Sequence, residues 1–293
     1  MIPVATVPKT TAVAEQLLDA LERLSKPSPD LLPGNLEVRK REELELHDHK
    51  RDTEYVQGLN VHAREKFLGD YKFYRVNKDV AKYIDGWIAT HSPGKVVLDY
   101  ACGHGHHATM AAQFGAALAI GIDISPVSVA IARNDAAAAG VQDRTAFAQA
   151  DCENTCLPDS SIDVIICSGM LHHLDLSYAF PELRRILKPG GIILAAEALR
   201  YNPLIKIYRK LTPQMRSKWE EEHILSYRDL RFASHFFEVK NVRHWTLVAL
   251  WGVYMPPLLS LFRWIDSYLL SVPLIKLMSW IFTFELHKLQ KVR

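Results

Sequence analysis

The chain of 293 residues is long enough for two domains of ordinary size, or for one large α/β domain with attached segments. Apolar residues make up 48% and charged residues 23% of it, which excludes a wholly disordered, collagen-like or coiled-coil protein. Four cysteines are too few for a disulfide scaffold, and no secretory pattern opens the sequence. We therefore expect a cytoplasmic protein.

The net charge of +2 conceals an uneven distribution along the chain. Residues 200–293 contain 15 Lys and Arg against 7 Asp and Glu, whereas residues 1–199 carry a net charge of −6. A basic third that is also rich in Trp, Leu and Ile suggests contact with anionic lipid or with an apolar substrate. A solvated basic face is the commoner explanation of such a charge excess.

Residues 1–75 are predicted to form a helical arm and a lid. The first 55 residues combine a helical patch at 13–24, a proline-rich break at 26–29 and a charge-dense run at 39–52. We interpret them as an arm outside the core. Three aromatic residues near the end of this region are expected to cover a cofactor or simply to pack: Tyr71, Phe73 and Tyr74.

Residues 76–199 are predicted to form an α/β core around a doubly wound, mostly parallel sheet. Short apolar runs occur at 96–98, at 118–120 with Ile122, at 146–148, at 164–166 with Ile162, and at 192–194. Several are uninterrupted by polar residues, which is typical of strands buried on both faces. Helical patterns at about 105–114, 126–139 and 177–187 alternate with them. Ser125 and Pro126 suit the start of the second helix, and Asp175 suits the cap of the third.

Acidic residues lie at the ends of three predicted strands. Asp99 leads into the turn Gly103-His104-Gly105, and the next two strands end at Asp123 and Asp151. Ligands of parallel sheets bind at these strand ends, where small residues allow close approach and a carboxylate can bind ribose hydroxyls. Three acids indicate a ligand rich in hydrogen-bond donors; the alternative is that each caps a turn. Ala108, three residues after Gly105, also permits a dinucleotide fingerprint.

These motifs together resemble class I S-adenosylmethionine-dependent methyltransferases. The resemblance extends over residues 99–191, and its most specific part is Leu187-Lys-Pro-Gly-Gly191 before the fifth strand. It is closest to the small-molecule and lipid branch, similar to methyltransferase type 11. The other segments that carry it are 99–105, 121–126, 150–151, 157–158, 161–163 and 171–174.

The resemblance implies a Rossmann-like methyltransferase fold that binds S-adenosyl-L-methionine. The residues it assigns to the cofactor are Asp99, Ala101, Gly103, Gly105, Asp123, Ile124, Asp151, Cys152 and Ser168. By position, Asp123 would bind the ribose hydroxyls and Asp151 the adenine amino group. Ala101 stands where such enzymes usually have glycine, and its methyl group is tolerable if its φ is negative.

Three histidines after the first strand, His104, His106 and His107, invite a comparison with metal sites. The Asp-His pair of binuclear hydrolases is missing, and residues two apart on a helix do not share a face. We therefore predict no metal site. A loop hydrogen bond is expected for His104, and packing or pocket-lining for His106 and His107.

The catalytic candidates are His172, His173 and Glu197. The two histidines follow the fourth strand, where one imidazole is expected to face the acceptor and remove its proton. Each could instead cap a helix or bind a backbone carbonyl. Glu197, at the tip of the fifth strand, is the second candidate base; as a structural residue it would pair with Arg200 or Arg209.

Residues 200–293 are predicted to complete the sheet and to form a helical region around the acceptor. The uncharged run 246–262 is interrupted by two prolines and is shorter than the roughly 20 residues of a spanning helix. Large side chains here suit an apolar pocket, although a homodimer interface or shallow membrane insertion of 246–293 would use the same residues. They are Trp251, Tyr254, Met255, Phe262, Trp264, Tyr268, Trp280 and Phe282.

The sequence thus predicts methyl transfer from S-adenosylmethionine to a small, apolar or lipid-like acceptor, with the methylated atom left open. One alternative is an NAD(P)-dependent Rossmann oxidoreductase, and another is a non-enzymatic membrane-surface or scaffold protein. Nucleic acid is not expected as a partner, because Ser168-Gly169-Met170 contains no aromatic base pocket. Expected partners are the acceptor, a membrane surface and a second copy of the chain.

Overall fold

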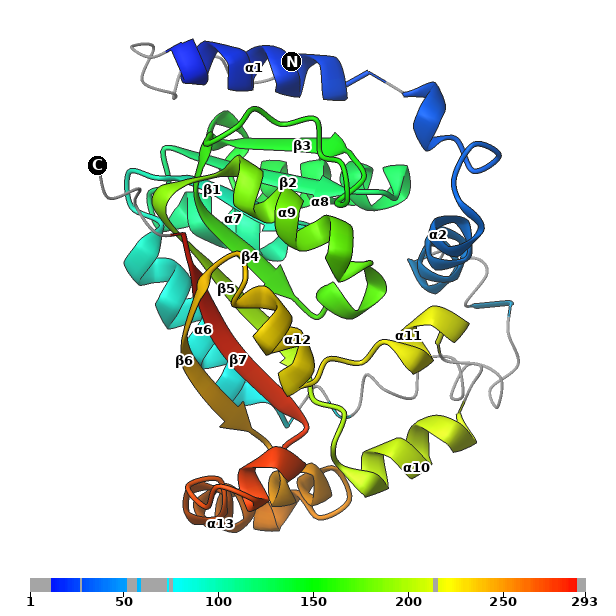
Figure 1. The fold of residues 1–293 in the computed structure, drawn as a ribbon, viewed down its shortest axis with the longest axis vertical. Coiled ribbons are helices and arrows are strands. Elements are labelled where there is room, and N and C mark those ends of the chain that lie inside the picture. Colours follow the sequence, from blue (N-terminus) through cyan, green and yellow to red (C-terminus); the bar gives the residue numbers. More distant parts are fainter. Residues whose placement is uncertain are drawn as a thin grey trace.

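The computed structural model describes residues 12–26, 28–51, 57–58, 73, 76–212 and 216–288. Its centre is a seven-stranded sheet in the order β3-β2-β1-β4-β5-β7-β6 (Figure 1). β7 runs antiparallel to β5 and β6 on either side of it, and the other four neighbouring pairs are parallel, so the prediction of a doubly wound, mostly parallel sheet is confirmed. The strands are β1 (Val96–Tyr100), β2 (Leu118–Asp123), β3 (Thr145–Gln149), β4 (Ile162–Ser168), β5 (Leu187–Ala198), β6 (Glu238–Trp245) and β7 (Ile281–His287).

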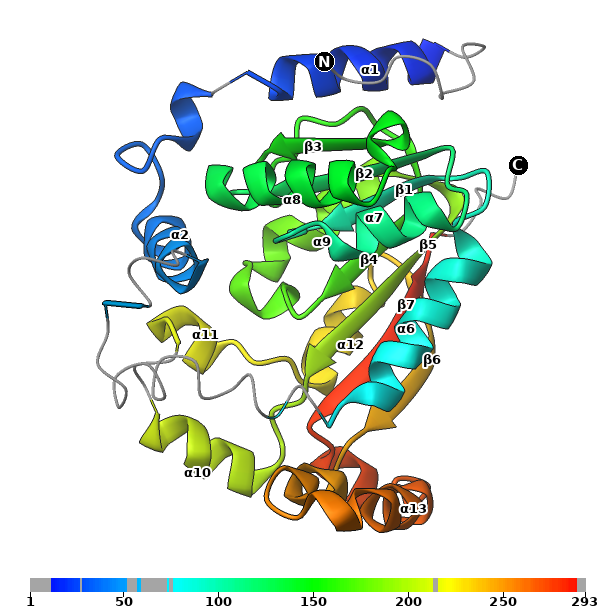
Figure 2. The ribbon, with the colours of Figure 1, turned by 180° about the vertical axis from the view of Figure 1, so that it is seen from behind.

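Helices cover both faces of the sheet (Figures 1 and 2). One face packs against α6 (Lys78–His91), α7 (His106–Gln113) and α8 (Pro126–Ala138). The other packs against α9 (Leu176–Ile186) and α12 (Tyr227–Ala233). The helices predicted from periodicity agree with α7, α8 and α9 to within one residue at each end.

The predicted helix starts are also confirmed. The Ser125 hydroxyl accepts a hydrogen bond from the backbone N–H of Ser128 at 3.0 Å, and Pro126 occupies the first position of α8. The Asp175 carboxylate accepts from the N–H of Ser177 at 2.8 Å, which caps α9. These side chains satisfy amide groups that have no partner within their own helix.

The helix α1 (Ala12–Leu24) departs from the expectation of an arm outside the core. It lies beside β3, and its Leu17 and Leu21 are buried in the same apolar cluster as Leu98 and Tyr100 of β1. Its leucines recur at intervals of three or four residues, which places them on one face. The interpretation of residues 1–55 as lying outside the core is therefore wrong for α1.

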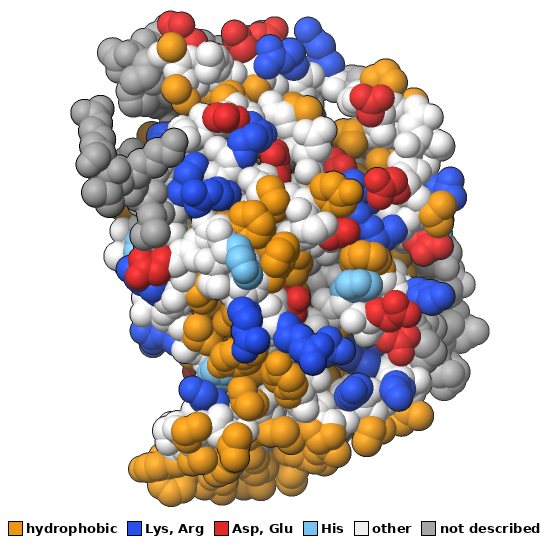
Figure 3. Space-filling view, viewed as in Figure 1, with side chains coloured by type: hydrophobic (Ala, Val, Ile, Leu, Met, Phe, Trp, Pro, Cys, Tyr) orange, Lys and Arg blue, Asp and Glu red, His pale blue; other side chains and the backbone are white. Residues whose placement is uncertain are grey.

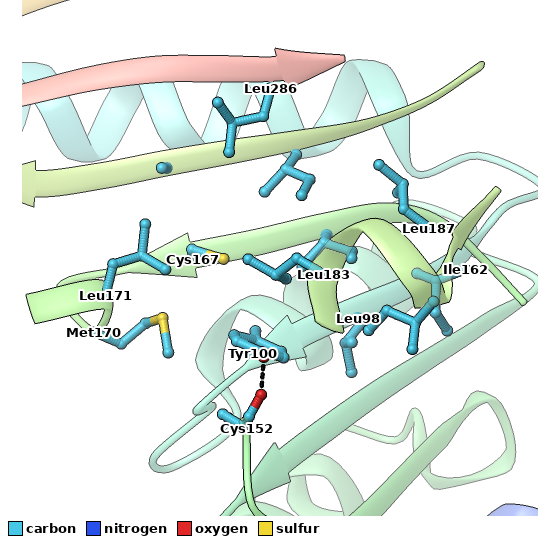
Figure 4. Packing of buried hydrophobic residues seen from close by; sticks show 14 of the residues in the cluster. Leu98, Tyr100, Cys152, Ile162, Cys167, Met170, Leu171, Leu183, Leu187 and Leu286 are labelled. Atoms are coloured by element: carbon cyan, nitrogen blue, oxygen red, sulfur yellow. Dashed lines mark hydrogen bonds between the residues drawn. The ribbon is translucent and has the colours of Figure 1, made fainter. Parts of the chain in front are cut away.

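The core between the sheet and α9 also fixes a segment of the ligand-binding edge. Tyr100 is fully buried there, and its hydroxyl donates to the carbonyl of Cys152 (Figure 4). This bond ties the residues after β3 to the end of β1. Asp151 is therefore held beside the strand ends that carry Asp99 and Asp123.

Residues 247–279, which we call the cap, connect the paired strands β6 and β7. Trp245 pairs with Ile281, and the Trp280 N–H donates to the Thr246 carbonyl at 2.8 Å, so the two ends of the cap meet. Among the described residues, no helix is long and apolar enough to cross a membrane. The cap consists of η5 (Val248–Val253), η6 (Pro256–Leu258), α13 (Leu259–Leu269) and η7 (Ile275–Met278).

Three further helices lie near the carboxyl ends of the parallel strands or beside the cap (Figure 2). They are α2 (Val38–Arg51), α10 (Pro203–Leu211) and α11 (Lys218–Glu222). Single turns are η1 (Pro29–Leu31), η2 (Gln142–Arg144), which directly precedes β3, and η3 (Leu171–His173).

Candidate active site

A cavity of about 310 Å³ lies where the strand order reverses between β1 and β4. This is the position at which open α/β sheets bind their ligands. Of the residues expected to bind the cofactor, all except Gly105 line this cavity, which we call the cofactor cavity. Gly105 lies behind it, where an added Cβ would approach an atom of the Phe147 ring to 2.5 Å.

The turn between β1 and α7 decides whether the methyl group of Ala101 is tolerated. Ala101 has a φ of +55°, as Gly103 does at +53° and Gly105 at +70°. The left-handed conformation brings Cβ close to the following carbonyl oxygen, so only glycine adopts it without a penalty. The condition of a negative φ at Ala101 is therefore not met, and this residue is strained.

Two carboxylates of the cofactor cavity organise the backbone around it. Asp123, which is buried, accepts hydrogen bonds from the N–H of Gly103 at 2.8 Å and of Ser125 at 2.9 Å. Asp99 accepts from the Ala108 N–H at 3.2 Å. Each carboxylate oxygen can accept more than one bond, so both residues keep acceptor capacity toward the cavity.

His107 lies against the second of these carboxylates, with its Nδ1 3.7 Å from Asp99 Oδ1. Burial on its own would lower the pKa of His107, but the Asp99 carboxylate raises it by more, so that the net shift is upward. His106 and His107 both line the cavity, as expected, whereas His104 is exposed and lines neither this cavity nor its neighbour.

The third carboxylate is engaged by a helix that the sequence reasoning did not connect with the site. Asp151 accepts from Lys40 Nζ of α2 at 2.7 Å, and the neighbouring Arg39 donates to Glu153 at 2.7 and 2.8 Å. Asp48, further along α2, makes a 2.5 Å hydrogen bond with Ser125. The helix α2 therefore closes one side of the cofactor cavity.

Glu43 of α2 forms a second polar cluster with His173 and His47. Its Oε2 lies 2.9 Å from His173 Nδ1 and 3.7 Å from His47 Nε2, and its other oxygen accepts from the Ser217 hydroxyl. Burial raises the pKa of Glu43 and lowers that of His173, but their mutual hydrogen bond reverses both shifts. The ligand atoms of the three residues lie within 4.8 Å of one another, so this group could also hold a divalent cation.

A second cavity of about 840 Å³, which we call the acceptor cavity, adjoins the first. The two cavities share His106, His107, Ser168 and Gly169 in their walls. Most of the larger wall is apolar and comes from α6, α10 and the cap. Polar side chains from several elements also line it, among them His172, Glu197 and Glu220.

His172 and Glu197 form a buried pair in the acceptor cavity. His172 Nδ1 lies 2.7 Å from Glu197 Oε2, while Glu197 Oε1 accepts from the backbone N–H groups of Met170 at 2.8 Å and Leu171 at 2.7 Å. The partners of the Glu197 carboxylate in these three hydrogen bonds are Met170, Leu171 and His172, and not the Arg200 or Arg209 expected for a structural role. This geometry favours Glu197 as the residue that orients His172.

The opposite nitrogen of His172 faces two residues that the sequence reasoning missed. His172 Nε2 lies 3.9 Å from Glu220 of α11, and Arg216 Nε lies 3.6 Å from the same carboxylate. His173, by contrast, lines the cofactor cavity. The structure therefore separates the two adjacent histidines, with one imidazole on each cavity.

Only some of the large side chains expected around the acceptor line its cavity. Trp251, Tyr254 and Trp280 do so. Phe282 is buried within β7, Phe262 is half-buried outside the cavity, and Met255, Trp264 and Tyr268 are exposed. Phe73, expected in a lid over the cofactor, instead lines the acceptor cavity. Its two companions, Tyr71 and Tyr74, lie outside the described residues.

Residues 97–191 match the family model described as "Methyltransferase domain". Over 107 residues, 36% of this chain and 39% of the relative, the chain is 35% identical to 27-O-demethylrifamycin SV methyltransferase from Amycolatopsis mediterranei. Over 101 residues, 34% of this chain and 27% of the relative, it is 36% identical to a sterol 24-C-methyltransferase from Gibberella zeae. The chain thus spans well under half the length of these relatives.

Solved structures show the same fold at lower identity. Geranyl diphosphate C-methyltransferase from Streptomyces coelicolor, in complex with Mg²⁺, geranyl diphosphate and S-adenosyl-L-homocysteine, superposes with a TM-score of 0.54. The match covers 72% of this chain and 80% of that one at 16% identity.

Proposed function

We propose that this chain, a class I S-adenosylmethionine-dependent methyltransferase by its matched domain, methylates a largely apolar small molecule. The observation that carries the proposal is the junction of its two cavities. The smaller one is rich in carboxylates and the larger one is mostly apolar, and they share Ser168 and Gly169 at the end of β4. A donor and an acceptor held in the two cavities would meet there.

The residues of the cofactor cavity suit S-adenosylmethionine. Asp99, Asp123 and Asp151 present three carboxylates to one space, which matches a ligand with hydroxyl and amino donors and a net positive charge. We assign Asp123 to the ribose, Asp151 to the adenine amino group, and Asp99 with the 101–105 backbone to the methionine end. Lys40 already bonds to Asp151, so an adenine there would share that carboxylate with the lysine.

The bound cofactor would supply an activated methyl group, and the protein would position the acceptor, remove its proton and exclude water. We assign the proton transfer to Nε2 of His172. With Nδ1 donating to Glu197, the neutral imidazole presents Nε2 as an acceptor. The Glu197 carboxylate would also stabilise the imidazolium that forms.

The apolar wall of the acceptor cavity indicates the class of acceptor. Small-molecule pockets are mainly apolar, with a few polar groups that fix orientation, and this cavity has that composition. Some relatives are named for small molecules, a sterol and a rifamycin, whereas others at 33–35% identity are named for ribosomal protein L11, so the proposed acceptor class rests on the cavity. The matched family model and both curated relatives described above are methyltransferases, which favours this function over the nicotinamide-dependent alternative.

Calorimetric titration with S-adenosylmethionine and NADH tests the proposal. We expect binding of the former only, and Asp123→Ala should weaken it by roughly 2–4 kcal/mol, the magnitude of lost charge-assisted hydrogen bonds. Asp163→Ala is the matched control, because Asp163 also accepts a backbone N–H, that of Val96, but lines neither cavity. An unchanged dissociation constant in Asp123→Ala would contradict the assignment.

A further inference from the structure

The cap and α10 expose an apolar surface at one end of the molecule. Figure 3 shows it as a continuous hydrophobic band along that end, with Lys and Arg side chains beside it. We call the exposed apolar side chains of residues 203–211 and 247–279 the apolar patch. Its largest members, Trp251, Tyr254, Trp264 and Tyr268, are each more than half exposed. Contiguous exposed surfaces of this kind mark sites of interaction.

All but one of the charged side chains in the same two segments are positive. They include Lys206, Lys210 and Lys276, whereas Asp266 is their only acidic residue. Asp266 is buried and accepts hydrogen bonds from three backbone N–H groups at the start of the cap, at 2.7 to 3.1 Å. The exposed surface of α10 and the cap therefore combines aromatic and aliphatic side chains with cations and contains no carboxylate of its own.

The acceptor cavity is continuous with this surface. Leu204 of α10 and Trp251 and Tyr254 of the cap line the cavity, and each also has more than half of its surface exposed. The same side chains thus form both the cavity wall and the patch. A ligand that crosses the patch would reach the cavity along apolar surface.

We infer that the apolar patch docks this protein on an anionic lipid bilayer, so that the acceptor cavity opens toward the lipid. Trp and Tyr favour the membrane–water interface, and anionic lipids attract nearby Lys and Arg. A symmetric dimer through the patch would place its cations against the same cations of the second copy, without acidic partners from these segments. Given the proposed function, on which this step rests, an apolar acceptor enters from the bilayer without crossing water.

Sedimentation of the full chain with vesicles tests the docking surface directly. We expect binding to vesicles of mixed phosphatidylcholine and phosphatidylglycerol, and weaker binding to phosphatidylcholine alone. Trp264→Ser with Tyr268→Ser should weaken binding by about tenfold or more, because two interfacial aromatics are lost. Neither residue lines the acceptor cavity. The matched control is Tyr178→Ser on α9, which is 62% exposed and lies outside the patch.

Charge reversal tests the lipid preference. Lys206→Glu with Lys210→Glu should abolish the advantage of anionic vesicles, whereas Lys95→Glu, exposed before β1, should retain it. The inference is overturned if the unaltered chain does not sediment with anionic vesicles, or if the Trp264/Tyr268 variant binds like the control. A dimer in light scattering that this variant converts to a monomer would assign the patch to a second copy instead.

Calorimetry with S-adenosylmethionine on the same proteins separates this inference from the proposed function. Vesicle binding without cofactor binding would refute the methyltransferase proposal and leave the docking surface intact. Cofactor binding without vesicle binding would refute the docking surface alone.

Discussion

Ala101 adopts a left-handed backbone conformation that its own methyl group disfavours. At φ +55° an alanine is destabilised by roughly 1–2 kcal/mol relative to its right-handed conformations. Ala101→Gly should therefore raise the free energy of unfolding by about 1 kcal/mol, although the added freedom of the unfolded chain offsets part of the gain. Urea unfolding followed by circular dichroism measures this change.

Ala130→Gly on α8 provides a control that should destabilise the protein. Ala130 is exposed in the interior of the helix, where glycine costs about 0.5–1 kcal/mol. If Ala101→Gly destabilised the protein as much as Ala130→Gly does, the interpretation of Ala101 as strained would be wrong.

The two adjacent histidines should differ in their effect on activity. His172→Gln is expected to lower turnover by about 10²–10⁴ with little change in cofactor affinity, because its imidazole faces the acceptor cavity. His173→Gln should mainly weaken cofactor binding, because His173 lines the cofactor cavity and bonds to α2. Transfer of label from methyl-labelled cofactor to solvent-extracted lipid measures turnover, and calorimetry measures affinity.

His104→Gln is the control for both variants, since His104 lines neither cavity. Full activity of His172→Gln would exclude His172 as the base. The sequence could predict that one imidazole faces the acceptor, but not which one, because η3 turns the two side chains in different directions. That geometry depends on Glu43 and Glu197, which lie far from the histidines in sequence.

At the scale of elements, α2 should respond to pH through Glu43 and His173. The raised pKa of His173 gives the pair a stabilising contribution that is complete below about 6.5 and is lost as the pH rises through the folded-state value. The lowered pKa of Glu43 gives a second stabilising contribution, which is complete above the ordinary glutamate pKa of 4.5 and is lost as the pH falls through the folded-state value. Both contributions are therefore complete between about pH 4.5 and 6.5, where they stabilise the packing of α2 against the site.

Hydrogen exchange of the α2 amides, corrected for intrinsic rates and measured with EDTA to remove any bound cation, checks this dependence. Protection should be several-fold greater at pH 6 than at pH 8.5, since a charged hydrogen bond contributes about 1 kcal/mol or more. Glu43→Gln should remove most of the difference, and the exposed Glu42→Gln should preserve it. Equal protection at both pH values in the unaltered chain would contradict the prediction.

The elements that the sequence predicted are those with a periodic signal. Strands such as 192–194 are continuous apolar runs, and helices such as 126–139 have a serine cap and a proline start. The role of α2 lacks such a signal, because its charged side chains bind carboxylates more than 100 residues away. Lys40 and Asp151 are related only through the fold.

At the scale of the whole molecule, the cap should be separable from the sheet. Because Thr246 and Trp280 are joined by a hydrogen bond, residues 247–279 can be replaced by an Asn-Gly turn. We expect the variant to unfold cooperatively and to bind cofactor while losing vesicle binding and methyl transfer. Thermal melts, calorimetry and vesicle sedimentation test the three parts.

Deletion of residues 246–293 is to be compared with the cap replacement, because it removes both the cap and the strand β7, which lies between β5 and β6. We expect this deletion to abolish cooperative unfolding. A cap replacement that also failed to unfold cooperatively would show that the cap stabilises the sheet. The sequence predicted that residues 200–293 complete the sheet, but it did not predict the strand order. That order depends on the pairing of β6 with β7, which are separated in sequence by the whole cap.

The inner position of β7 has a consequence for the synthesis of the chain. During synthesis β5 emerges from the ribosome long before β7. At a synthesis rate of about 5–20 residues per second, the delay between them is roughly 5–20 s. During this interval the apolar strand β5 has an unpaired edge, which is a hazard for aggregation. Nascent chains of this protein should therefore depend on chaperones until residue 287 has emerged, and a ribosome that pauses within the cap should prolong that dependence.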